Sequence, residues 1–286
     1  MSKSSQIFYI AAFFFCASCV AYTAKDNEPL NSQATPVLRA HAHNDYQHRR
    51  PLLDALDNGF CSVEADVFLV NDALLVAHFL IFVRPNRTLE SLYLEPLRKR
   101  TQQYNGKIYP DAERFYLWIE IKSDAEKTYA VLRNVLEQYA DILTRYEHGV
   151  EIPGAVTVIL TGKAGLGLIQ NESVRYACID GRLSALNSDV SADLIPVVSL
   201  NWRSEFSGFT GTLTSAEREK LAEQVRKAHE RGRKLRYWNT PDHEKFWKIL
   251  LDAEVDFINT DRLESLRIFL EKSDMRSRRS RSVQTP

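Results

Sequence analysis

The stretch CSVEADVFLVNDALLVAH, residues 61–78, decides the expected fold. It reads as a strand, a turn rich in Asn and Asp, and a second strand that ends at His78. Alternate side chains of an extended chain share a face, so Glu64 and Asp66 point the same way from an otherwise apolar strand. Because an unpaired buried charge is costly, these carboxylates need a cation or a basic partner. The rest of the chain has to supply it.

Titratable side chains also end the strands expected on either side. The preceding strand alternates so that His41 and His43 share a face. His43 is nearer the strand end and its loop, so we take it as the functional member of the pair. A later strand, residues 115–122, places Glu120 and Lys122 on one face. We therefore expect three carboxylates, a lysine and two histidines to share one space.

Strand and helix patterns alternate along most of the chain. About eight strand candidates, mostly separated by helices, have the number and spacing of a TIM (β/α)₈ barrel. A doubly wound sheet is the alternative. In a barrel the carboxyl ends of the strands form one face, and that face carries the active site. The polar residues at expected strand ends are His43, Glu120, Lys122, Lys163, Trp238, Asn259 and Asp261.

Helical spacing marks several of the segments between strands. Residues 125–146 read as one long amphipathic helix, and residues 88–103 as a helix with a break at Pro96. A further helix is expected over residues 242–251, where Asp242 is in position to cap it.

Composition narrows the class of protein. The chain has 286 residues and is 44% hydrophobic and 26% charged, which is typical of a globular protein with a sizeable core. Lys+Arg and Asp+Glu are balanced at 37 each, so no nucleic-acid partner is expected. Cys61 and Cys178 could form one disulfide in an oxidising compartment, and no cysteine spacing suggests a zinc site.

The N-terminus has the layout of a secretory signal peptide. Lys3 precedes an uncharged apolar run over residues 7–20, and small residues follow it. The run is short for a membrane span, although an uncleaved anchor is the alternative. We predict a secreted or periplasmic protein. Lipidation at Cys19 is disfavoured, because Cys16 stands where a lipoprotein cleavage box usually has an aliphatic residue.

Four segments follow from these patterns. Residues 1–24 are the signal peptide, and residues 25–36 are a polar linker. Residues 37–272 form one barrel domain. Residues 273–286 carry Arg among Ser residues with no apolar run, and we predict a disordered basic tail.

The three expected carboxylates have the chemistry of a metal site. Hard oxygen ligands such as Glu64, Asp66 and Glu120 suit Mg²⁺ or Ca²⁺. Without a cation, at least one of them would be driven towards protonation. The alternative is an ion-pair layer inside the barrel, with Lys122 and Arg39 as the basic partners.

The two histidines suggest acid–base chemistry. His43 and His78 come from opposite sides of the acidic strand, and two imidazoles across one substrate can act as general base and general acid near neutral pH. Lys122 can stabilise developing negative charge. This set favours hydrolysis or internal transfer at a phosphodiester.

The candidate site residues and the motifs around them resemble those of a known superfamily. The chain resembles the glycerophosphodiester phosphodiesterase and phosphatidylinositol-specific phospholipase C-like superfamily, in a subgroup that includes the altered inheritance of mitochondria protein of fungi. The resemblance runs from residue 38 to residue 270 and implies a TIM barrel and a divalent cation. It also implies catalytic roles for His43 and His78, and metal binding by Glu64, Asp66 and Glu120. The motifs that carry it are HAHNDY (41–46), RPLLDAL (50–56), SVEADV (62–67), TLESLYLEPL (88–97), LTGK (160–163), YWNTPD (237–242) and FINTDRL (257–263).

The chain departs from the superfamily pattern at two places. Phe79 follows the second histidine where an acidic residue is usual, and an apolar stretch continues to Phe82. His43-Asn44-Asp45 replaces the His-Arg-Gly of glycerophosphodiesterases. Both departures bear on the substrate rather than on the chemistry.

The leading hypothesis is a metal-dependent phosphoric diester hydrolase. Its expected substrate is a phospholipid or a glycerophosphodiester-like molecule, with contact to a membrane surface as a further possibility. One alternative is a lyase that forms a cyclic phosphate, and another is a non-catalytic secreted barrel that binds metal and ligand. A sugar-handling barrel is disfavoured, because two carboxylates two residues apart on one strand suit a metal better than a glycosidase acid–base pair.

Overall fold

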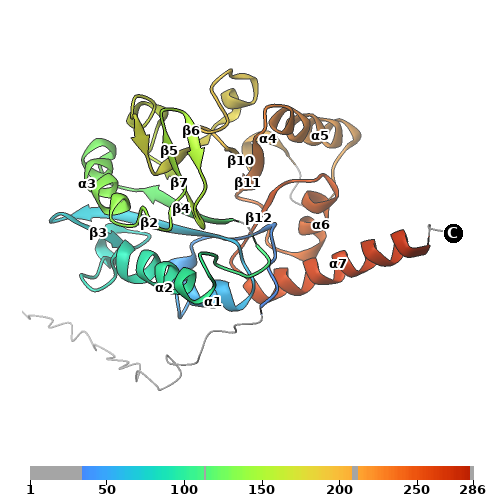
Figure 1. Ribbon diagram of the computed structural model, residues 1–286. Coiled ribbons are helices and arrows are strands. Elements are labelled where there is room, and N and C mark those ends of the chain that lie inside the picture. The colour runs from blue at the N-terminus through green and yellow to red at the C-terminus, as the bar shows by residue number, and fades with distance from the viewer. Residues whose placement is uncertain (1–33, 113, 208–211, 284–286) are drawn as a thin grey trace, which may run out of the picture.

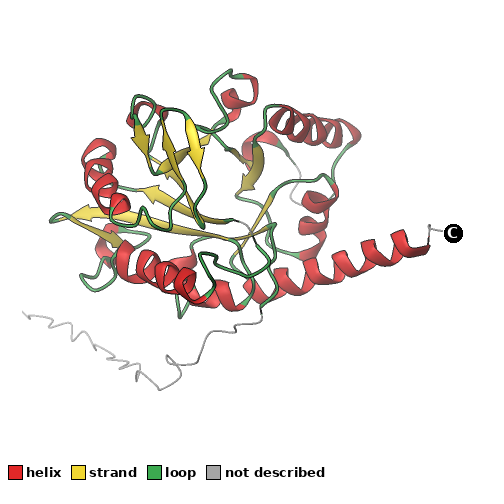
Figure 2. Ribbon diagram, viewed as in Figure 1, coloured by secondary structure: helices red, strands yellow, loops and turns green. Residues whose placement is uncertain are grey.

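The computed structural model describes residues 34–112, 114–207 and 212–283 (Figure 1). The expected signal peptide, residues 1–24, lies outside the described residues, as does most of the expected linker. The described chain folds into strands enclosed by helices (Figure 2).

Eight parallel strands of the described chain close into a barrel. Each pairs in parallel with its neighbours, and β1 pairs with both β12 and β2, which closes the ring. The predicted (β/α)₈ barrel is confirmed, and the doubly wound alternative is wrong because an open sheet has two unpaired edges. In order around the ring the strands are β1 (Ala40–Ala42), β2 (Ser62–Val70), β4 (Phe115–Ile121), β7 (Val156–Gly162), β9 (Ala177–Gly181), β10 (Val197–Asn201), β11 (Lys234–Trp238) and β12 (Phe257–Thr260).

Helices follow most of the strands and bury their apolar faces against the outside of the barrel. Leu132, Leu221 and Leu250 are examples of side chains fully buried in this layer. The connection from β7 to β9 is irregular and contains a single 3-10 turn, Leu166–Leu168, where a regular barrel has a helix. The α-helices are α1 (Leu53–Asp57), α2 (Glu95–Gln103), α3 (Ala125–Glu137), α4 (Trp202–Glu205), α5 (Ser215–Glu230), α6 (Glu244–Asp252) and α7 (Leu263–Val283).

The stretch 61–78 folds as a hairpin added to the barrel. β2 pairs antiparallel with β3 (Ala73–Val76) through the turn at Asn71 and Asp72. Both turn residues have positive φ, 48° and 61°, which Asn and Asp tolerate better than most side chains. The predicted strand–turn–strand is confirmed, and it returns the chain to His78. A separate small sheet contains β5 (Arg145–Glu147), β6 (Val150–Ile152) and β8 (Val174–Arg175).

The helix expected over residues 125–146 is shorter than predicted. It ends at Glu137, and β5 begins at Arg145. The residues between them join the barrel, because Thr144 N donates to Val156 O at 2.7 Å and Val156 N donates to Ile142 O at 3.0 Å. The predicted helix is too long because buried apolar residues in this bridging segment continue the helical spacing of the sequence.

Asp242 does not cap α6, contrary to the prediction. His243 is the N-cap, and its side chain accepts from the backbone of Phe246. Asp242 instead joins α6 to the end of β12, accepting from Trp247 Nε1 at 3.0 Å and from Asp261 N at 3.0 Å. The bond from Asp261 N holds the loop that carries Asp261.

The prediction of a disordered tail is wrong over residues 273–283. α7 continues to Val283, and Figure 1 shows its last turns extending away from the barrel. From Leu263 to Val283 the sequence contains neither Pro nor Gly, the two residues that end a helix most strongly.

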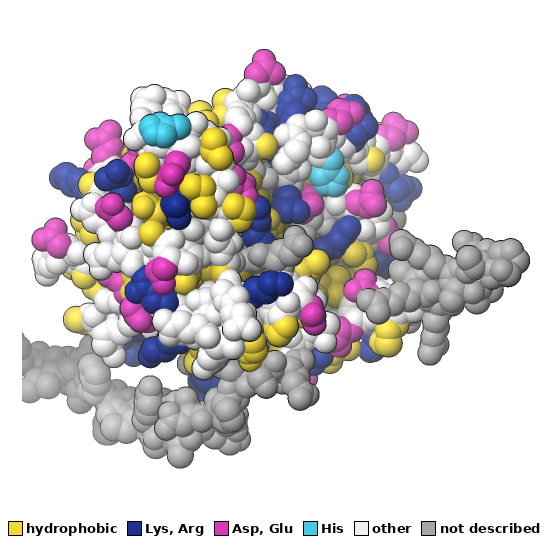
Figure 3. Space-filling model, in the orientation of Figure 1, with side chains coloured by type: hydrophobic (Ala, Val, Ile, Leu, Met, Phe, Trp, Pro, Cys, Tyr) yellow, Lys and Arg dark blue, Asp and Glu magenta, His cyan; other side chains and the backbone are white. Residues whose placement is uncertain are grey.

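Cys61 and Cys178 are both buried free thiols, so the disulfide considered from the sequence does not form. Cys178 Sγ instead donates to the hydroxyl of Tyr146 at 3.3 Å. Acidic and basic side chains are interspersed on the face seen in Figure 3, as the balanced composition predicts. Among the described residues, no helix has the length and apolarity needed to cross a membrane.

Candidate active site

Three carboxylates converge on two adjacent strands. Glu64 and Asp66 lie on β2, and Glu120 lies on β4, where it is the register partner of Asp66. One ligand oxygen from each lies within 4.8 Å of the others. Glu64 and Asp66 are buried, and Glu120 is partly buried. We call these three residues the carboxylate triad, and its members are those singled out from the sequence.

The charges of the triad oppose one another. Burial raises the pKa of Asp66, and the nearby charge of Glu64 raises it further. Burial also raises the pKa of Glu120, with the charges of Asp66 and Glu64 adding to the effect. Burial opposes ionisation of Glu64 too, but the Arg236 guanidinium and His41 hold its pKa well below the usual range.

The triad fits a hard divalent cation. All its ligand atoms are carboxylate oxygens, which Mg²⁺ and Ca²⁺ prefer. Among the described residues, Asp66 Oδ1 is a buried oxygen with no hydrogen-bond donor. A cation among these oxygens would satisfy that atom and lower the repulsion that raises the pKa values of Asp66 and Glu120.

Lys122 lies beside the triad, as its place two residues after Glu120 predicts. Its Nζ is 3.1 Å from Asp66 Oδ2 and 3.2 Å from Glu120 Oε1. The sequence also offered Arg39 as a basic partner, but Arg39 donates to the backbone of Val255 instead. The second cation is Arg236 on β11, whose Nη2 lies 3.4 Å from Glu64 Oε2.

His43 stands at one side of the triad. Its Nε2 is 4.0 Å from Glu64 Oε2, and its Nδ1 is 2.9 Å from Asp261 Oδ1. The ring is 36% exposed, so a substrate can reach it. Burial lowers the pKa of His43, but the bond to Asp261 and the charge of Glu64 outweigh burial and raise it above the ordinary value.

His41 occupies a different environment from that of His43. It is fully buried, its Nδ1 lies 2.7 Å from Ser62 Oγ, and its ring packs edge-on against Trp118. Burial and the charge of Arg236 lower its pKa to about 3, so the ring is neutral at physiological pH. His41 belongs to the packed interior, whereas His43 lines the open cavity.

His78 stands at the other side of the triad. Its Nδ1 is 3.1 Å from Asp66 Oδ2 and 2.9 Å from the hydroxyl of Tyr46, and its side chain is 38% exposed. Because Nδ1 is held by these two partners, Nε2 remains for a substrate. The hairpin β2–β3 therefore places His78 next to the carboxylates, as the stretch 61–78 predicts.

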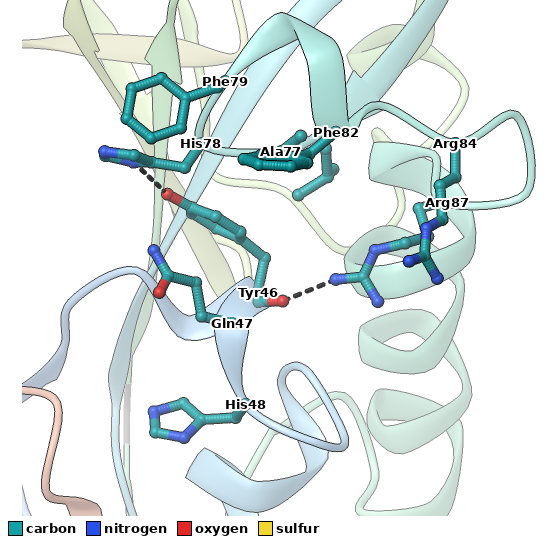
Figure 4. Close-up of a pocket in the computed structure, with 10 residues that line it drawn as sticks. Tyr46, Gln47, His48, Ala77, His78, Phe79, Phe82, Arg84 and Arg87 are labelled. Carbon is teal, nitrogen blue, oxygen red and sulfur yellow. Dashed lines mark hydrogen bonds between the residues drawn. The ribbon is translucent and has the colours of Figure 1, made fainter. Parts of the chain in front are cut away.

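Tyr46 is a buried residue of the site that sequence analysis did not identify. Its hydroxyl lies 2.8 Å from Asp66 Oδ2 and 2.7 Å from Asn44 Oδ1. It also lies 2.9 Å from His78 Nδ1 (Figure 4). Asn44 has φ 48°, which turns the chain sharply after β1 and brings Tyr46 back under His78. Tyr46 is part of the motif HAHNDY, but residue spacing alone does not show which way its side chain points.

Further polar groups line the same cavity, which has a volume of about 240 Å³ and also contains Asn44, Thr161, Gly162 and Trp238. Asp180 is buried on β9 and accepts from Thr161 Oγ1 at 3.0 Å. Burial raises the pKa of Asp180 to about 6. Asp180 on β9, Arg182 directly after β9, and Arg236 on β11 are distant in sequence from residues 61–78, so pattern reading along the chain did not identify them as site residues.

A closed (β/α)₈ barrel with a polar cavity at the carboxyl ends of its strands has the architecture of a barrel enzyme. The sequence match agrees, since residues 29–180 match the family described as AIM6-like phosphodiesterase domain. The chain belongs to this family. It is 34% identical over 274 residues to altered inheritance of mitochondria protein 6 of Eremothecium gossypii, covering 82% of this chain and 70% of that relative. The homolog in Arthroderma benhamiae is 30% identical over 273 residues, covering 82% of this chain and 87% of the homolog.

Two solved structures share a distant likeness. One is a glycerophosphodiester phosphodiesterase from Agrobacterium tumefaciens, with 13% identity, a TM-score of 0.47, and coverage of 82% of this chain and 99% of that one. The other is a glycerophosphodiester phosphodiesterase from Parabacteroides distasonis, with 15% identity, a TM-score of 0.49, and coverage of 84% and 100%.

Proposed function

We propose that this protein is a metal-dependent phosphoric diester hydrolase with a two-histidine acid–base mechanism. The observation that carries the proposal is that each histidine contacts a different member of one carboxylate triad. His43 lies against Glu64, and His78 lies against Asp66. Membership in a phosphodiesterase-domain family supports the same reaction class.

The histidines would move the protons of the reaction. Hydrolysis of a diester needs a proton taken from the attacking water and a proton given to the leaving alcohol. His43 is oriented by Asp261, and His78 is oriented by Tyr46 and Asp66. Each ring is held through Nδ1 by a carboxylate, so each would use Nε2 for proton transfer. For His43 the substrate would displace Asn44 Nδ2, which lies 3.2 Å from Nε2.

The acidic and basic groups around the phosphate would have different electrostatic roles. Glu64, Asp66 and Glu120 would hold Mg²⁺ or Ca²⁺, which when bound stabilises negative charge developing on the phosphate. Lys122 would bind a phosphate oxygen from the side of β4. Its contacts with Asp66 and Glu120 keep its ammonium charge balanced before the substrate arrives.

Product analysis tests the reaction class. Glycerophosphodiesters, lysophospholipids and phospholipids are incubated with the protein in water labelled with heavy oxygen, and the products are followed by phosphorus NMR. We expect a phosphomonoester that carries the label. A cyclic phosphate without the label would replace hydrolysis by the lyase reaction, and metal binding without turnover on any diester would contradict the proposal in favour of a binding barrel.

Substituting Gly162 is expected to disturb the triad. Gly162 has φ +71°, and an added Cβ would lie 2.5 Å from Glu120 Cγ and 2.9 Å from the Ile121 carbonyl oxygen. Gly162→Ala should therefore displace Glu120 and lower metal affinity and turnover by about 10–100-fold. Calorimetric titration with Mg²⁺ and Ca²⁺ measures the affinity.

Gly165→Ala is the matched control, since its added Cβ would meet no heavy atom within 4 Å apart from those of residue 165 and its two chain neighbours. We expect this variant to bind metal and turn over substrate like the wild type. Unchanged metal affinity in Gly162→Ala would show that Glu120 is not a ligand.

Removing the hydroxyl of Tyr46 is expected to impair the site while leaving the fold intact. Tyr46→Phe keeps the buried ring but leaves Asp66 and His78 without their shared partner, so turnover should fall by about 10–100-fold. The pH profile of kcat should shift as well, because the hydrogen bond from Tyr46 lowers the pKa of Asp66 and its loss would raise that pKa. Tyr176→Phe is the control, because Tyr176 precedes the amino end of β9 and does not line the cavity, so this variant should change neither quantity. An unchanged kcat and pH profile in Tyr46→Phe would contradict a positioning role.

A further inference from the structure

The segment directly after His78 is apolar and exposed. Phe79, Leu80, Ile81 and Phe82 are 56%, 55%, 83% and 62% exposed, and the last three form a single 3-10 turn. The other exposed large apolar side chains of the described chain are separated in sequence: Leu38, Val150, Leu183, Trp238 and Met275. Because apolar surface left in water is costly, a contiguous exposed group of this kind marks a contact site.

This segment belongs to the rim of the candidate active site. The ring of Phe79 packs edge-on against His78 with centroids 4.4 Å apart, and Phe82 lies 6.2 Å from Phe79. Any surface or molecule that contacts residues 79–82 therefore also comes close to His78.

A cavity of about 500 Å³ lies behind the segment and is amphiphilic (Figure 4). Ala77, Phe79 and Phe82 line it with apolar groups, and Arg84 and Arg87 line it with positive charge. Arg87 donates to the backbone oxygen of Tyr46 at 2.6 Å, whereas no carboxylate of the described chain forms an ion pair with the exposed Arg84. The cavity thus offers an apolar wall and cations next to a histidine of the site.

We propose that residues 79–82 are a membrane-docking loop that inserts into the surface of an anionic phospholipid bilayer. Arg84 and Arg87 then lie at the level of the head groups, and a lipid phosphodiester enters the cavity beside His78. The substrate part of this inference rests on the proposed hydrolase function, whereas the docking itself does not.

The chemistry of the loop favours a bilayer over a protein partner. Aromatic and aliphatic side chains beside Arg are typical of segments that lie in a membrane interface. Arg84 and Arg87 complement the negative surface of an anionic leaflet, where each basic residue adds to binding. A stable interface between two copies of the chain needs about 1,200–2,000 Å² of buried surface, more than the four side chains of residues 79–82 supply.

A fluorophore attached at the loop tests docking directly. Ile81→Cys is labelled with an environment-sensitive dye in the full chain with Cys16→Ser and Cys19→Ser, since Cys61 and Cys178 are buried. Phosphatidylcholine vesicles containing phosphatidylserine should shift the emission to the blue, and vesicles of phosphatidylcholine alone should do so less. The same dye at Val150→Cys, a site of 64% exposure, is the control and should not respond.

Turnover then separates docking from chemistry. The double variant Leu80→Ser, Ile81→Ser should lose about 10-fold or more of its activity on lipid in vesicles, because several buried methylene groups are removed from the interface. Its activity on a soluble diester should equal that of the wild type. Leu38→Ser, Val150→Ser removes apolar side chains elsewhere and should change neither activity.

Each alternative has a distinct outcome. A dye at residue 81 that ignores every vesicle overturns the proposal. A dimer in light scattering that the double variant dissociates, without a vesicle response, overturns it in favour of self-association. An equal response to neutral and anionic vesicles overturns the choice of anionic lipid. A vesicle response without turnover on any diester supports docking and removes the hydrolase function alone.

Discussion

Replacing either His43 or His78 with alanine is expected to lower phosphodiester turnover by about 10²–10⁴-fold, the usual contribution of a positioned acid or base. The two rings are 36% and 38% exposed, so their removal opens no large internal cavity. The melting temperature should therefore stay close to that of the wild type. Initial rates on a chromogenic diester, with thermal unfolding of the same samples, measure both effects.

Two further histidine variants sharpen this result. His41→Ala removes a fully buried ring that contacts Ser62 and Trp118, so it should lower the free energy of unfolding by about 1–3 kcal/mol. His229→Ala removes only a partly exposed pair with Asp256 and should keep full turnover. Full activity in both His43→Ala and His78→Ala would contradict the mechanism.

Neutralising one carboxylate of the triad is expected to abolish metal binding. Glu120→Gln keeps the shape of the side chain but removes a ligand charge, and turnover should fall by about 10²-fold or more. In chelator at neutral pH this variant should melt at a higher temperature than the wild type. The reason is that burial and the charges of Asp66 and Glu64 raise the pKa of Glu120, so the folded protein disfavours its negative charge. Glu120→Gln removes that charge.

The direction of the change in melting temperature follows from the linkage between protonation and folding. A carboxyl whose pKa is raised by folding binds its proton more tightly in the folded state. Its contribution to stability is therefore greatest below the unfolded pKa and is lost as pH rises through the folded pKa. Glutamine mimics the protonated form at every pH, so it avoids that loss.

Glu147→Gln is the matched control, because Glu147 pairs with Arg145 on the small sheet away from the cavity. It should bind metal and turn over substrate normally. Stabilisation of Glu120→Gln by Mg²⁺ or Ca²⁺ equal to that of the wild type would contradict the metal site.

Much of the fold and the centre of the candidate site could be predicted from local patterns. The alternation of strand and helix predicts parallel pairing, and parallel strands bring their carboxyl ends to one face. Period-two alternation then places Glu64 and Asp66 together, and the pairing of β2 with β4 brings Glu120 beside them. These inferences needed only neighbouring strands.

The partners that orient the site depend on contacts between distant parts of the chain. Asp261 reaches His43 because β12 pairs with β1, although the two residues are 218 positions apart. Arg236 reaches Glu64 across 172 positions. A single sequence read along its length contains no signal for the side-chain direction in such pairs.

The errors in secondary structure have local causes. Residues after Glu137 bury apolar side chains through turns and a bridge to Val156, and this burial continued a helical spacing that the backbone does not follow. Asp242 has the residue type of a helix cap, but its carboxylate bonds to Trp247 and the start of the loop at Asp261. Tertiary contacts overrode propensity in both places.

Metal depletion of the wild-type protein tests the central claim most directly. The protein is stripped with a chelator, and turnover of a phosphodiester is measured before and after Mg²⁺ or Ca²⁺ is restored. The proposed function predicts loss of turnover on stripping, recovery with one of these ions, and no recovery in Glu120→Gln. Full turnover in the stripped wild-type protein would contradict a metal-dependent diester hydrolase built on Glu64, Asp66 and Glu120.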